Sequence, residues 1–307
     1  MNEVRELSDR ITILRDGVVI VDGVPMSEKT DEEIVSDMLG EKLNTEEKKR
    51  KDSNAFESSA EVLSISFDGY DGELTVKEGE IVVLAGLAGS GRSSVLRTIW
   101  GTKPRSDIHL RYLGEEYKPK NPMHALKKKI AYISEDRSES GLFFGQPIKE
   151  TVLMAHRNLQ RKLLVKNKSE DKLLGQIIGE VQIKVPTHEC MPEALSGGNQ
   201  QKLLFGRWIT DEAKLLLLDE PTRGVDIKTK HEIYQRVRKM VEANNAGALV
   251  VSSELEELVL MCDKVLIIRD GHVEDVLTGD RITENNMMAE ITASGKTKQQ
   301  TEDNKSV

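Results

Sequence analysis

The chain contains the run Leu195-Ser196-Gly197-Gly198-Asn199-Gln200-Gln201-Lys202, a hydroxyl and two adjacent glycines in front of a helical pattern from Asn199 to about Thr210. Glycines leave backbone N–H groups uncovered, and the N-terminus of a helix carries positive potential. The run therefore predicts a surface that meets an anion, above all a phosphate. By itself Ser-Gly-Gly would predict only an ordinary loop, so the prediction depends on the neighbouring segments.

A second glycine-rich run has the strand-to-helix context that a phosphate loop requires. The apolar segment Glu80–Ala85 leads into Gly86-Leu87-Ala88-Gly89-Ser90-Gly91-Arg92-Ser93-Ser94, and a helical pattern follows at Val95–Trp100. In a P-loop, successive N–H groups form a nest around the β-phosphate, with the helix dipole behind it. The predicted nucleotide-binding residues are Gly86, Gly89, Ser90, Gly91, Arg92, Ser93 and Ser94. The hydroxyl of Ser93 is placed to ligate Mg²⁺.

An apolar run that ends in two acids follows the first segment. It reads Leu215-Leu216-Leu217-Leu218-Asp219-Glu220 and continues as Pro221-Thr222-Arg223-Gly224-Val225-Asp226. We expect a buried strand, Lys214–Leu218, beside the strand that leads into the P-loop. Asp219 can then hold Mg²⁺ through water, and Glu220 stands where a general base would polarise the attacking water. Paired acids also cap ordinary strands, but not usually before Pro-Thr-Arg-Gly-Val-Asp.

The order and spacing of these runs resemble the P-loop, signature loop, Walker B strand and D-loop of ABC-type ATPases. The resemblance implies an α/β fold: a P-loop NTPase core with an inserted helical subdomain, about 136–195, and an N-terminal antiparallel β region. It assigns Gly224 and Asp226 to the D-loop. It assigns the signature loop to Leu195, Ser196, Gly197, Gly198, Asn199 and Gln200. The sequence Gly-Gly-Asn-Gln-Gln-Lys is similar to the corresponding segment in the second module of the duplicated ATP-binding proteins of simple-sugar importers.

Three positions depart from the general ABC pattern. Arg92 replaces the P-loop lysine and offers a wide planar fork instead of a compact ammonium. Glu135, after an expected strand Lys129–Ile133, replaces the Q-loop glutamine; a carboxylate can ligate Mg²⁺ but cannot donate as an amide does. Ser253, at the end of the expected strand Ala248–Ser253, replaces the switch histidine. We expect this module's own site to bind ATP and Mg²⁺ but to turn ATP over slowly, while its signature loop serves the partner module.

The segment between the Q-loop position and the signature loop has a mostly helical pattern, with helices expected at Ile148–Leu159 and Asp171–Ile183. In the family, the residues just after the Q-loop touch the transmembrane partner. Phe143 and Phe144 are bracketed by glycines in a chain with 4% aromatic residues, so an exposed patch that contacts the permease is one interpretation. The core of the helical subdomain is the other.

Residues 3–19 and 257–273 repeat one another at an offset of 254, with Asp9 matching Asp263. Each copy predicts a helix end, a buried strand, an Asp-Gly turn and a second strand, and helices are expected near Thr30–Met38 and Ile282–Ile291. Two strands and two short helices cannot bury a core alone. We therefore expect 1–40 to be the tail of a first module, 41–60 a charged linker, 61–293 a complete module and 294–307 a disordered tail. The recurring residues are Glu3, Asp9, Ile13, Arg15, Asp16, Gly17 and Val19.

Composition limits the remaining possibilities. The 307 residues carry a net charge of −8, which argues against a general nucleic-acid binder. The longest apolar runs, such as Ile81–Ala88, are too short to span a bilayer, and no charged-then-apolar leader opens the chain. Cys190 and Cys262 are far apart and suggest free thiols in a reducing cytoplasm. Any membrane role must therefore come through a partner.

The expected function is that of the ATP-binding and ATPase subunit of an ABC importer for simple sugars, on the cytoplasmic face of the cell membrane. Its cofactors would be ATP and Mg²⁺. Its partners would be a first ABC module or second ATPase subunit, a transmembrane permease and, indirectly, a substrate-binding protein, but no nucleic acid. Two alternatives stay open: a non-catalytic nucleotide-binding remnant of a truncated gene, and an ABC-type ATPase outside transport. The sequence does not identify the sugar.

Overall fold

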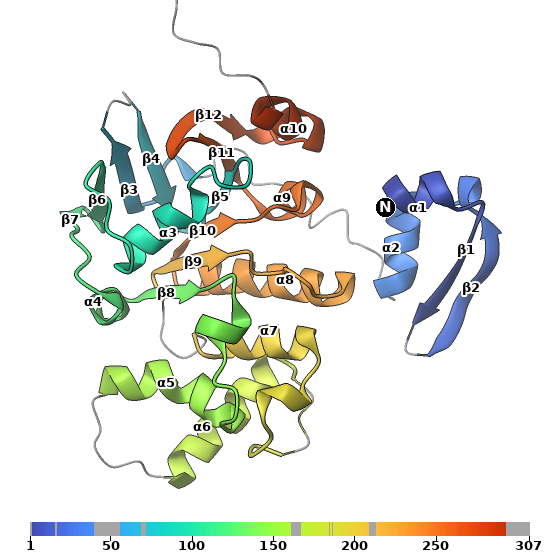
Figure 1. Cartoon of the computed structure of the whole chain (residues 1–307), viewed down its shortest axis with the longest axis horizontal. Helices are drawn as coiled ribbons and strands as arrows, with labels where there is room; N and C mark the ends of the chain where they lie inside the picture. The colour runs from blue at the N-terminus through green and yellow to red at the C-terminus, as the bar shows by residue number, and fades with distance from the viewer. Residues whose placement is uncertain are drawn as a thin grey trace, which may run out of the picture. The chain divides into compact units, whose positions relative to one another are not determined.

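The computed structural model describes residues 2–15, 17–39, 56–68, 72–160, 167–183, 185, 187–208 and 213–292 (Figure 1). The chain divides into two compact units. The first comprises Met1–Asp52, Asp136–Thr210 and Thr222–Met240, and the second comprises Ser53–Glu135, Asp211–Pro221 and Val241–Val307. Across the described ranges, no helix is long and apolar enough to cross a membrane.

The second unit is built on a six-stranded sheet of order β12-β11-β5-β10-β9-β8. All neighbours are parallel except the β11–β12 hairpin. Every residue of β5, β9 and β10 is buried, which is why these strands appear in the sequence as uninterrupted apolar runs. The bounds are β5 Ile81–Ala85, β8 Ile130–Ile133, β9 Leu215–Asp219, β10 Gly247–Val251, β11 Lys264–Arg269 and β12 His272–Thr278.

The expectation that the Walker B strand lies beside the P-loop strand is wrong, because β10 lies between β9 and β5. Helix α3 (Arg92–Trp100), which follows β5, packs on both β9 and β10. The chain therefore crosses over β10 as it leaves the P-loop. Three strands that are all buried apolar runs cannot be ordered from their sequences alone.

An antiparallel sheet of order β4-β3-β6-β7 lies in the same unit and corresponds to the expected N-terminal antiparallel β region. One apolar cluster contains residues of both sheets and of α3, among them Val62, Leu84 and Leu96, all fully buried. Phe56, inside the expected linker, is buried too, so ordered packing starts before residue 61. The remaining elements of the unit are β3 Glu61–Phe67, β4 Glu73–Lys77, β6 Ile108–Tyr112, β7 Glu115–Glu116, α4 Pro122–Lys127, α9 Leu255–Met261, η5 Gly279–Arg281 and α10 Glu284–Thr292.

The first unit contains the helices expected between the Q-loop position and the D-loop. Helix α7 (Gly197–Gly206) starts two residues before the expected position, because Ser196 caps it, and it contacts both α5 and α6. Helix α6 ends at Glu180, before the expected Ile183, and Gln182 takes a left-handed φ of 52°. The bounds are η3 Arg137–Gly141, α5 Ile148–Gln160, α6 Asn167–Glu180, η4 Pro192–Ala194 and α8 Ile227–Ala243. Helix α8 belongs to the first unit as far as Met240.

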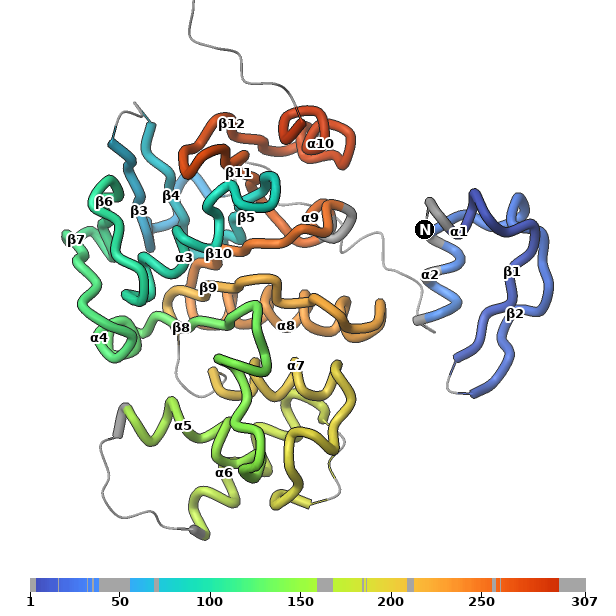
Figure 2. Tube along the Cα trace, viewed as in Figure 1, coloured from blue at the N-terminus to red at the C-terminus, as the bar shows by residue number. Residues whose placement is uncertain are grey.

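The sequence repeat is also a structural repeat (Figure 2). Residues 2–39 form α1 (Asn2–Leu7), β1 (Arg10–Arg15), β2 (Val18–Pro25), η1 (Met26–Glu28) and α2 (Asp31–Leu39). These match α9, β11, β12, η5 and α10 in order, and both hairpins have a bulge at the same place, Ile13/Leu14 and Ile267/Ile268. Asp16, residues 41–55 of the expected linker and the whole of the expected tail, 294–307, lie outside the described residues.

The two copies differ in burial. Leu14 is 63% exposed, whereas its counterpart Ile268 is 1% exposed. Leu7 is 86% exposed, whereas its counterpart Met261 is 5% exposed. Strand β11 pairs with β5 on one side and β12 on the other, and its Ile268 packs in the apolar core cluster, whereas β1 pairs with β2 alone among the described strands. Apart from the small cluster Ile13, Met26 and Ile34, the apolar side chains of the first copy remain largely exposed.

The matched aspartates of the repeat offer a stability test. The buried Asp263 carboxylate accepts a hydrogen bond of 2.8 Å from the Ile81 N–H, whereas Asp9 is exposed. Asp263→Ala should therefore lower the free energy of unfolding by about 1–3 kcal/mol, because it leaves a buried N–H unsatisfied. Asp9→Ala should change it by less than ~0.5 kcal/mol. Urea unfolding of the two variants checks this, and equal losses would contradict it.

Candidate functional site

The P-loop connects β5 to α3 and makes close backbone contacts. A Cβ on Gly86 would collide with the carbonyl oxygen of Ile268, so only glycine fits there. The Gly271 N–H donates to the Ser90 carbonyl, 2.8 Å, which joins the loop to the β11–β12 turn. Gly91 is the residue before α3. The first turn of such a helix leaves backbone N–H groups without intrahelical acceptors, as a phosphate site requires.

The Ser90 side chain provides a test of whether this loop suits a phosphate. Its hydroxyl is buried and has no hydrogen-bond partner among the described residues. Buried polar atoms in proteins nearly always have a partner, so an orphan of this kind indicates a missing ligand or water. A hydroxyl beside free helix N–H groups suits an anionic oxygen. The residues present are therefore compatible with bound nucleotide phosphate.

Ser93 and Asp219 meet across β10. The Ser93 Oγ donates to the Asp219 Oδ1 at 2.7 Å, although 126 residues separate them. Asp219 is fully buried at the end of β9, and this burial raises the pKa of its carboxyl, while the hydrogen bonds from Ser93 and Tyr132 oppose the rise. Hydroxyl and carboxylate oxygens are the ligands that Mg²⁺ prefers. The pair could therefore hold Mg²⁺ together with phosphate oxygens.

Tyr132 and Arg97 belong to the same network, and the sequence did not single them out. The Tyr132 hydroxyl donates to the Asp219 Oδ2 at 3.1 Å, and its ring stacks on Trp100 at 5.6 Å between centroids. Burial raises the pKa of the Tyr132 hydroxyl, so it remains a proton donor at neutral pH. A hydrogen bond with Tyr132 raises the pKa of Arg97, whose charge lies near Asp219. The one available signal was a hydroxyl inside the otherwise apolar strand β8.

Glu220 is held in a strained backbone conformation and faces Ser253. Its φ is +49°, which is unusual for a residue with a side chain. Its Oε2 accepts from the Ser253 N–H at 3.1 Å and from the Ser253 Oγ at 3.2 Å. Burial raises the pKa of the Glu220 carboxyl, against these bonds and the charge of Arg92. A carboxyl with a raised pKa is better matched to accepting a proton from water.

The other two departures from the ABC pattern also lie in the second unit. Arg92 donates through Nη1 to the Ser252 carbonyl at 3.0 Å, so its fork contacts the segment after β10. Glu135 is half-buried, and its charge acts to raise the pKa of both Asp219 and Arg97. The structure thus brings the P-loop, Asp219, Glu220 and Ser253 together. Ser94, the last P-loop residue, receives a hydrogen bond of 3.2 Å from Lys103.

The signature residues form the capped start of α7 in the first unit. The Ser196 Oγ accepts from the Asn199 N–H at 3.4 Å, and the Gln200 Nε2 donates to the carbonyls of Pro192 and Leu195 at 3.0 and 3.3 Å. Ser196 is exposed, whereas Leu195 is buried. A Cβ on Gly198 would lie 2.8 Å from the Thr229 Oγ1, so the start of α8 packs directly against the start of α7.

The D-loop residues lie before α8 in the same unit. Gly224 has a φ of +70°, which favours glycine. The Asp226 carboxylate accepts from the Thr229 N–H at 3.0 Å and from the Thr229 Oγ1 at 2.8 Å. Burial acts to raise the pKa of Asp226, but these two hydrogen bonds and the charge of Lys202 lower it overall. Arg137, which the sequence did not single out, lies near Gly224.

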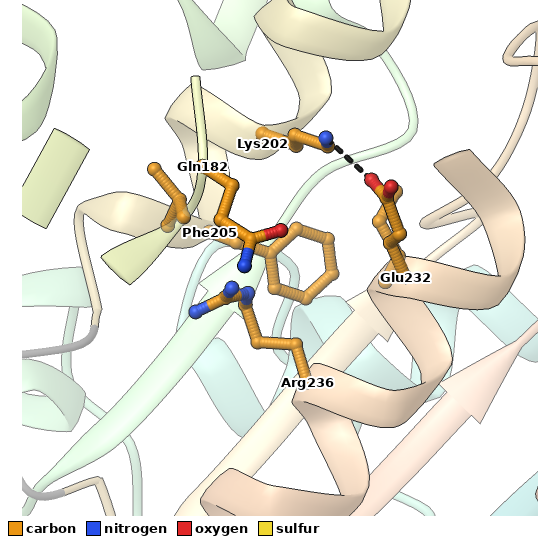
Figure 3. Close-up of a pocket in the computed structure, with 7 residues that line it drawn as sticks. Gln182, Lys202, Phe205, Glu232 and Arg236 are labelled. Atoms are coloured by element: carbon orange, nitrogen blue, oxygen red, sulfur yellow. Dashed lines mark ion pairs between the residues drawn. The ribbon is translucent and has the colours of Figure 1, made fainter. Parts of the chain in front are cut away.

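Two further features lie in the first unit. Phe143 and Phe144 are each 40% exposed, so neither is fully buried in the subdomain core. A small pocket is bordered by the Lys202–Glu232 ion pair and by Arg236, whose pKa is lowered by burial (Figure 3). It contains none of the predicted site residues. In the described ranges no group of three or more His, Cys, Asp or Glu side chains is placed to hold a metal.

Comparison with protein families gives a match of residues 71–223 to the family described as ABC transporter. The ribose import ATP-binding protein RbsA of Bacillus subtilis (strain 168) is 34% identical over 292 residues. The galactose/methyl galactoside import ATP-binding protein MglA of Fusobacterium nucleatum subsp. nucleatum is 33% identical over 294 residues. Each alignment covers 94% of this chain but only 58% of the relative. The chain therefore spans little more than half the length of these relatives.

Solved structures show the same fold. A nucleotide-free ATP-binding cassette from an ABC transporter superposes with a TM-score of 0.62 at 17% identity and covers 74% of this chain and 95% of its own. An ATP binding subunit of an ABC transporter gives a TM-score of 0.61 at 23% identity and covers 75% of this chain and 99% of its own. The expected ABC-type P-loop fold is therefore confirmed.

The raised pKa of Glu220 predicts how stability changes with pH. Where the folded-state pKa is raised, ionisation costs more in the folded protein than in the unfolded chain, so stability falls as pH rises from the unfolded pKa through the folded one. Glu220→Gln removes this ionisation and keeps an oxygen for Ser253. The variant should therefore melt at a higher temperature than the parent at pH 7.5. At a pH below the ordinary range of a glutamate the difference should vanish, and a lower melting temperature at pH 7.5 would contradict the assignment.

Proposed function

We propose that this chain, which contains an ABC transporter ATPase domain homologous to ribose and galactose import ATP-binding proteins, is the ATP-binding subunit of an importer for simple sugars. The nucleotide part of the proposal rests mainly on one observation, the 2.7 Å contact between Ser93 of the P-loop and Asp219. The sugar part rests on the functions named for the relatives. The subunit would work on the cytoplasmic face of the membrane.

ATP would be held by the P-loop and Mg²⁺ by Ser93, Asp219 and the half-buried Glu135. The N–H groups at the start of α3 and the unpaired Ser90 hydroxyl would bind phosphate oxygens. Bound MgATP supplies the phosphoanhydride that is cleaved. Glu220 would accept the proton of the attacking water, for which its half-buried position and raised pKa are suited.

We propose that this site is degenerate. The Arg92 fork already donates to a backbone carbonyl, which competes with a phosphate for the same donors. Ser253 donates to Glu220 and so holds the base, but it lacks the imidazole that the family pattern places near the γ-phosphate. A site of this kind would bind ATP and hydrolyse it slowly. The intact signature loop Ser196–Gln200 would act at the site of a partner module.

The other partners follow from exposed surfaces. Phe143 and Phe144 would contact the permease, and cross-linking from either position to the permease would test this. A substrate-binding protein would take part only indirectly. The exposed Leu7 and Leu14 support assigning residues 2–39 to a first module, because their counterparts Met261 and Ile268 are buried against an ATPase core.

The same exposure favours one alternative. A chain in which the apolar surface of α1 and β1 remains uncovered could be a non-catalytic, nucleotide-binding remnant. The two functions differ in whether a partner module restores turnover. An ABC-type ATPase outside transport gains no support from the structure.

The isolated chain should bind MgATP yet hydrolyse it poorly. Ser93→Ala and Asp219→Ala should each weaken Mg²⁺-dependent ATP binding by about tenfold or more, because each loses an oxygen ligand. Calorimetric titration with and without Mg²⁺ measures this, with Ser138→Ala, an exposed position, as the control. Robust turnover by the purified chain that Glu220→Gln abolishes would contradict the degenerate site.

Addition of a first module should restore ATP turnover through the signature loop. The probe is the N-terminal half of a homologous ribose import ATP-binding protein, mixed with this chain and assayed for phosphate release. Ser196→Arg should abolish the restored activity, because a long cation would fill the space that the γ-phosphate needs. The variant should still bind ATP at its own P-loop. If Ser196→Arg had no effect on restored turnover, the role of the signature loop would be wrong.

A further inference from the structure

Two arginines fasten the turn η3 to the signature helix α7, one at each end. Arg137, the first residue of η3, donates through Nη1 to the Gly197 carbonyl at 2.9 Å. Arg207, at the end of α7, donates to the carbonyls of Gly141, the last residue of η3, and of Thr151. The turn therefore lies along α7. It is a π-helical turn, a rare conformation that occurs frequently at functional sites.

The backbone of Arg137 is fixed by its neighbours. The Asp136 Oδ1 accepts from the N–H groups of Ser138 and Glu139 at 2.7 and 2.9 Å, and the Leu142 N–H donates to the Arg137 carbonyl at 2.7 Å. These bonds close the turn around the residue. The side chain of Arg137 thus starts from a defined point and reaches the signature loop 60 residues further along the chain.

The guanidinium occupies space that two glycines leave open. A Cβ on Gly197 would lie 3.3 Å from the Arg137 Nη1, and a Cβ on Gly224 would lie 3.3 Å from its Nη2. The Gly224 carbonyl oxygen would be 3.5 Å from the same Gly197 Cβ. The signature loop and the D-loop therefore meet around one planar fork. The planar guanidinium is wider than an ammonium and presents its N–H donors in fixed directions, so it can lie against both segments at once.

Within the described ranges no acidic side chain forms an ion pair with Arg137, whereas Arg157 in the same unit pairs with both Glu150 and Glu170. A half-buried arginine held by one carbonyl gains little stability from that single bond. Its position is better explained by the two segments that it joins.

We propose that Arg137 is a positioning residue that holds the signature loop and the D-loop as one unit. Through its bond to Gly197 and its contact with Gly224, it presents both loops together to the nucleotide of the partner module. The inference rests on the proposed function for the use of the loops, but the mechanical link between them does not depend on ATP turnover.

Hydrogen exchange on the full chain, followed by mass spectrometry, tests the link. Arg137→Met keeps the length of the side chain but removes its donors. It should raise amide exchange about fivefold, the factor expected for one lost hydrogen bond, in the segments 195–201 and 222–229 alike. Arg137→Lys should restore the parent rate of amide exchange at most in the segment 195–201. Arg111→Met is the control, because Arg111 is exposed and its guanidinium donates to the nearby Gly114 carbonyl, away from both segments in the sequence. Unchanged exchange in either segment of Arg137→Met would overturn the proposal.

A double-variant cycle tests whether Arg137 and Gly224 act on the signature segment through one connection or through two independent local effects. Gly224→Ala places a Cβ against the guanidinium and strains a positive φ, so it should raise exchange in the signature segment of the parent chain. In the Arg137→Met background the same change should add nothing there, because the connection is already lost. Independent, additive effects at the signature segment would refute the proposal.

Turnover distinguishes this inference from the proposed function. In the mixture with a first module, Arg137→Met should lower kcat for ATP while ATP affinity at the chain's own P-loop stays unchanged. If the exchange results are as expected but no mixture hydrolyses ATP, the link stands and the proposed function fails. If turnover is restored and Arg137→Met leaves both exchange and kcat unchanged, the proposed function stands and the positioning role is refuted.

Discussion

The hydrogen bond from Ser93 to the buried Asp219 is the contact on which the candidate site depends. It exists because β5, β10 and β9 are parallel, so their carboxyl ends lie at one edge of the sheet, and because α3 crosses β10 to reach β9. Were α3 packed on the other side of β5, Ser93 could not reach Asp219. The same edge positions Glu220 beside Ser253, since β9 and β10 are direct neighbours.

Burial is the main cause of the shifted pKa values of the two acids at this edge of the sheet. It raises the pKa of both Asp219 and Glu220, yet each carboxyl keeps hydrogen-bond donors that favour its charged form. The two acids differ in solvent exclusion and in their partners: Asp219 is fully buried and bound by Ser93 and Tyr132, whereas Glu220 is half-buried and bound by Ser253. This arrangement leaves Glu220 the freer of the two to accept a proton, while Asp219 is held for a metal.

The secondary structure of segments with a recognisable local motif was predictable from the sequence. The glycine run before α3 and the apolar run before Asp219 are each recognisable from neighbouring residues alone, because an apolar strand ends at residues with evident chemistry. Both runs formed the elements expected of them. The order of the strands was not predictable, because β5, β9 and β10 are interchangeable apolar runs. Tyr132 and Arg137 were missed for a related reason: their partners, Asp219 and Gly197, lie 87 and 60 residues away, and no local pattern encodes such a pairing.

The repeat shows most directly what a local pattern can and cannot determine. Both copies contain the sequence Ile-x-Arg-Asp-Gly, and the described strands on either side of the turn form a bulged hairpin in each, with a φ of 80° at Gly17 and 81° at Gly271. Hairpin geometry therefore follows from the residues themselves. Burial does not: Leu266 and Ile268 of β11 pack in a large apolar core cluster, whereas among the described residues β1 contributes only Ile13 to a small one. Similar hairpins thus give a core element in one copy and a largely exposed apolar surface in the other, and the difference lies in the side chains that pack against each hairpin.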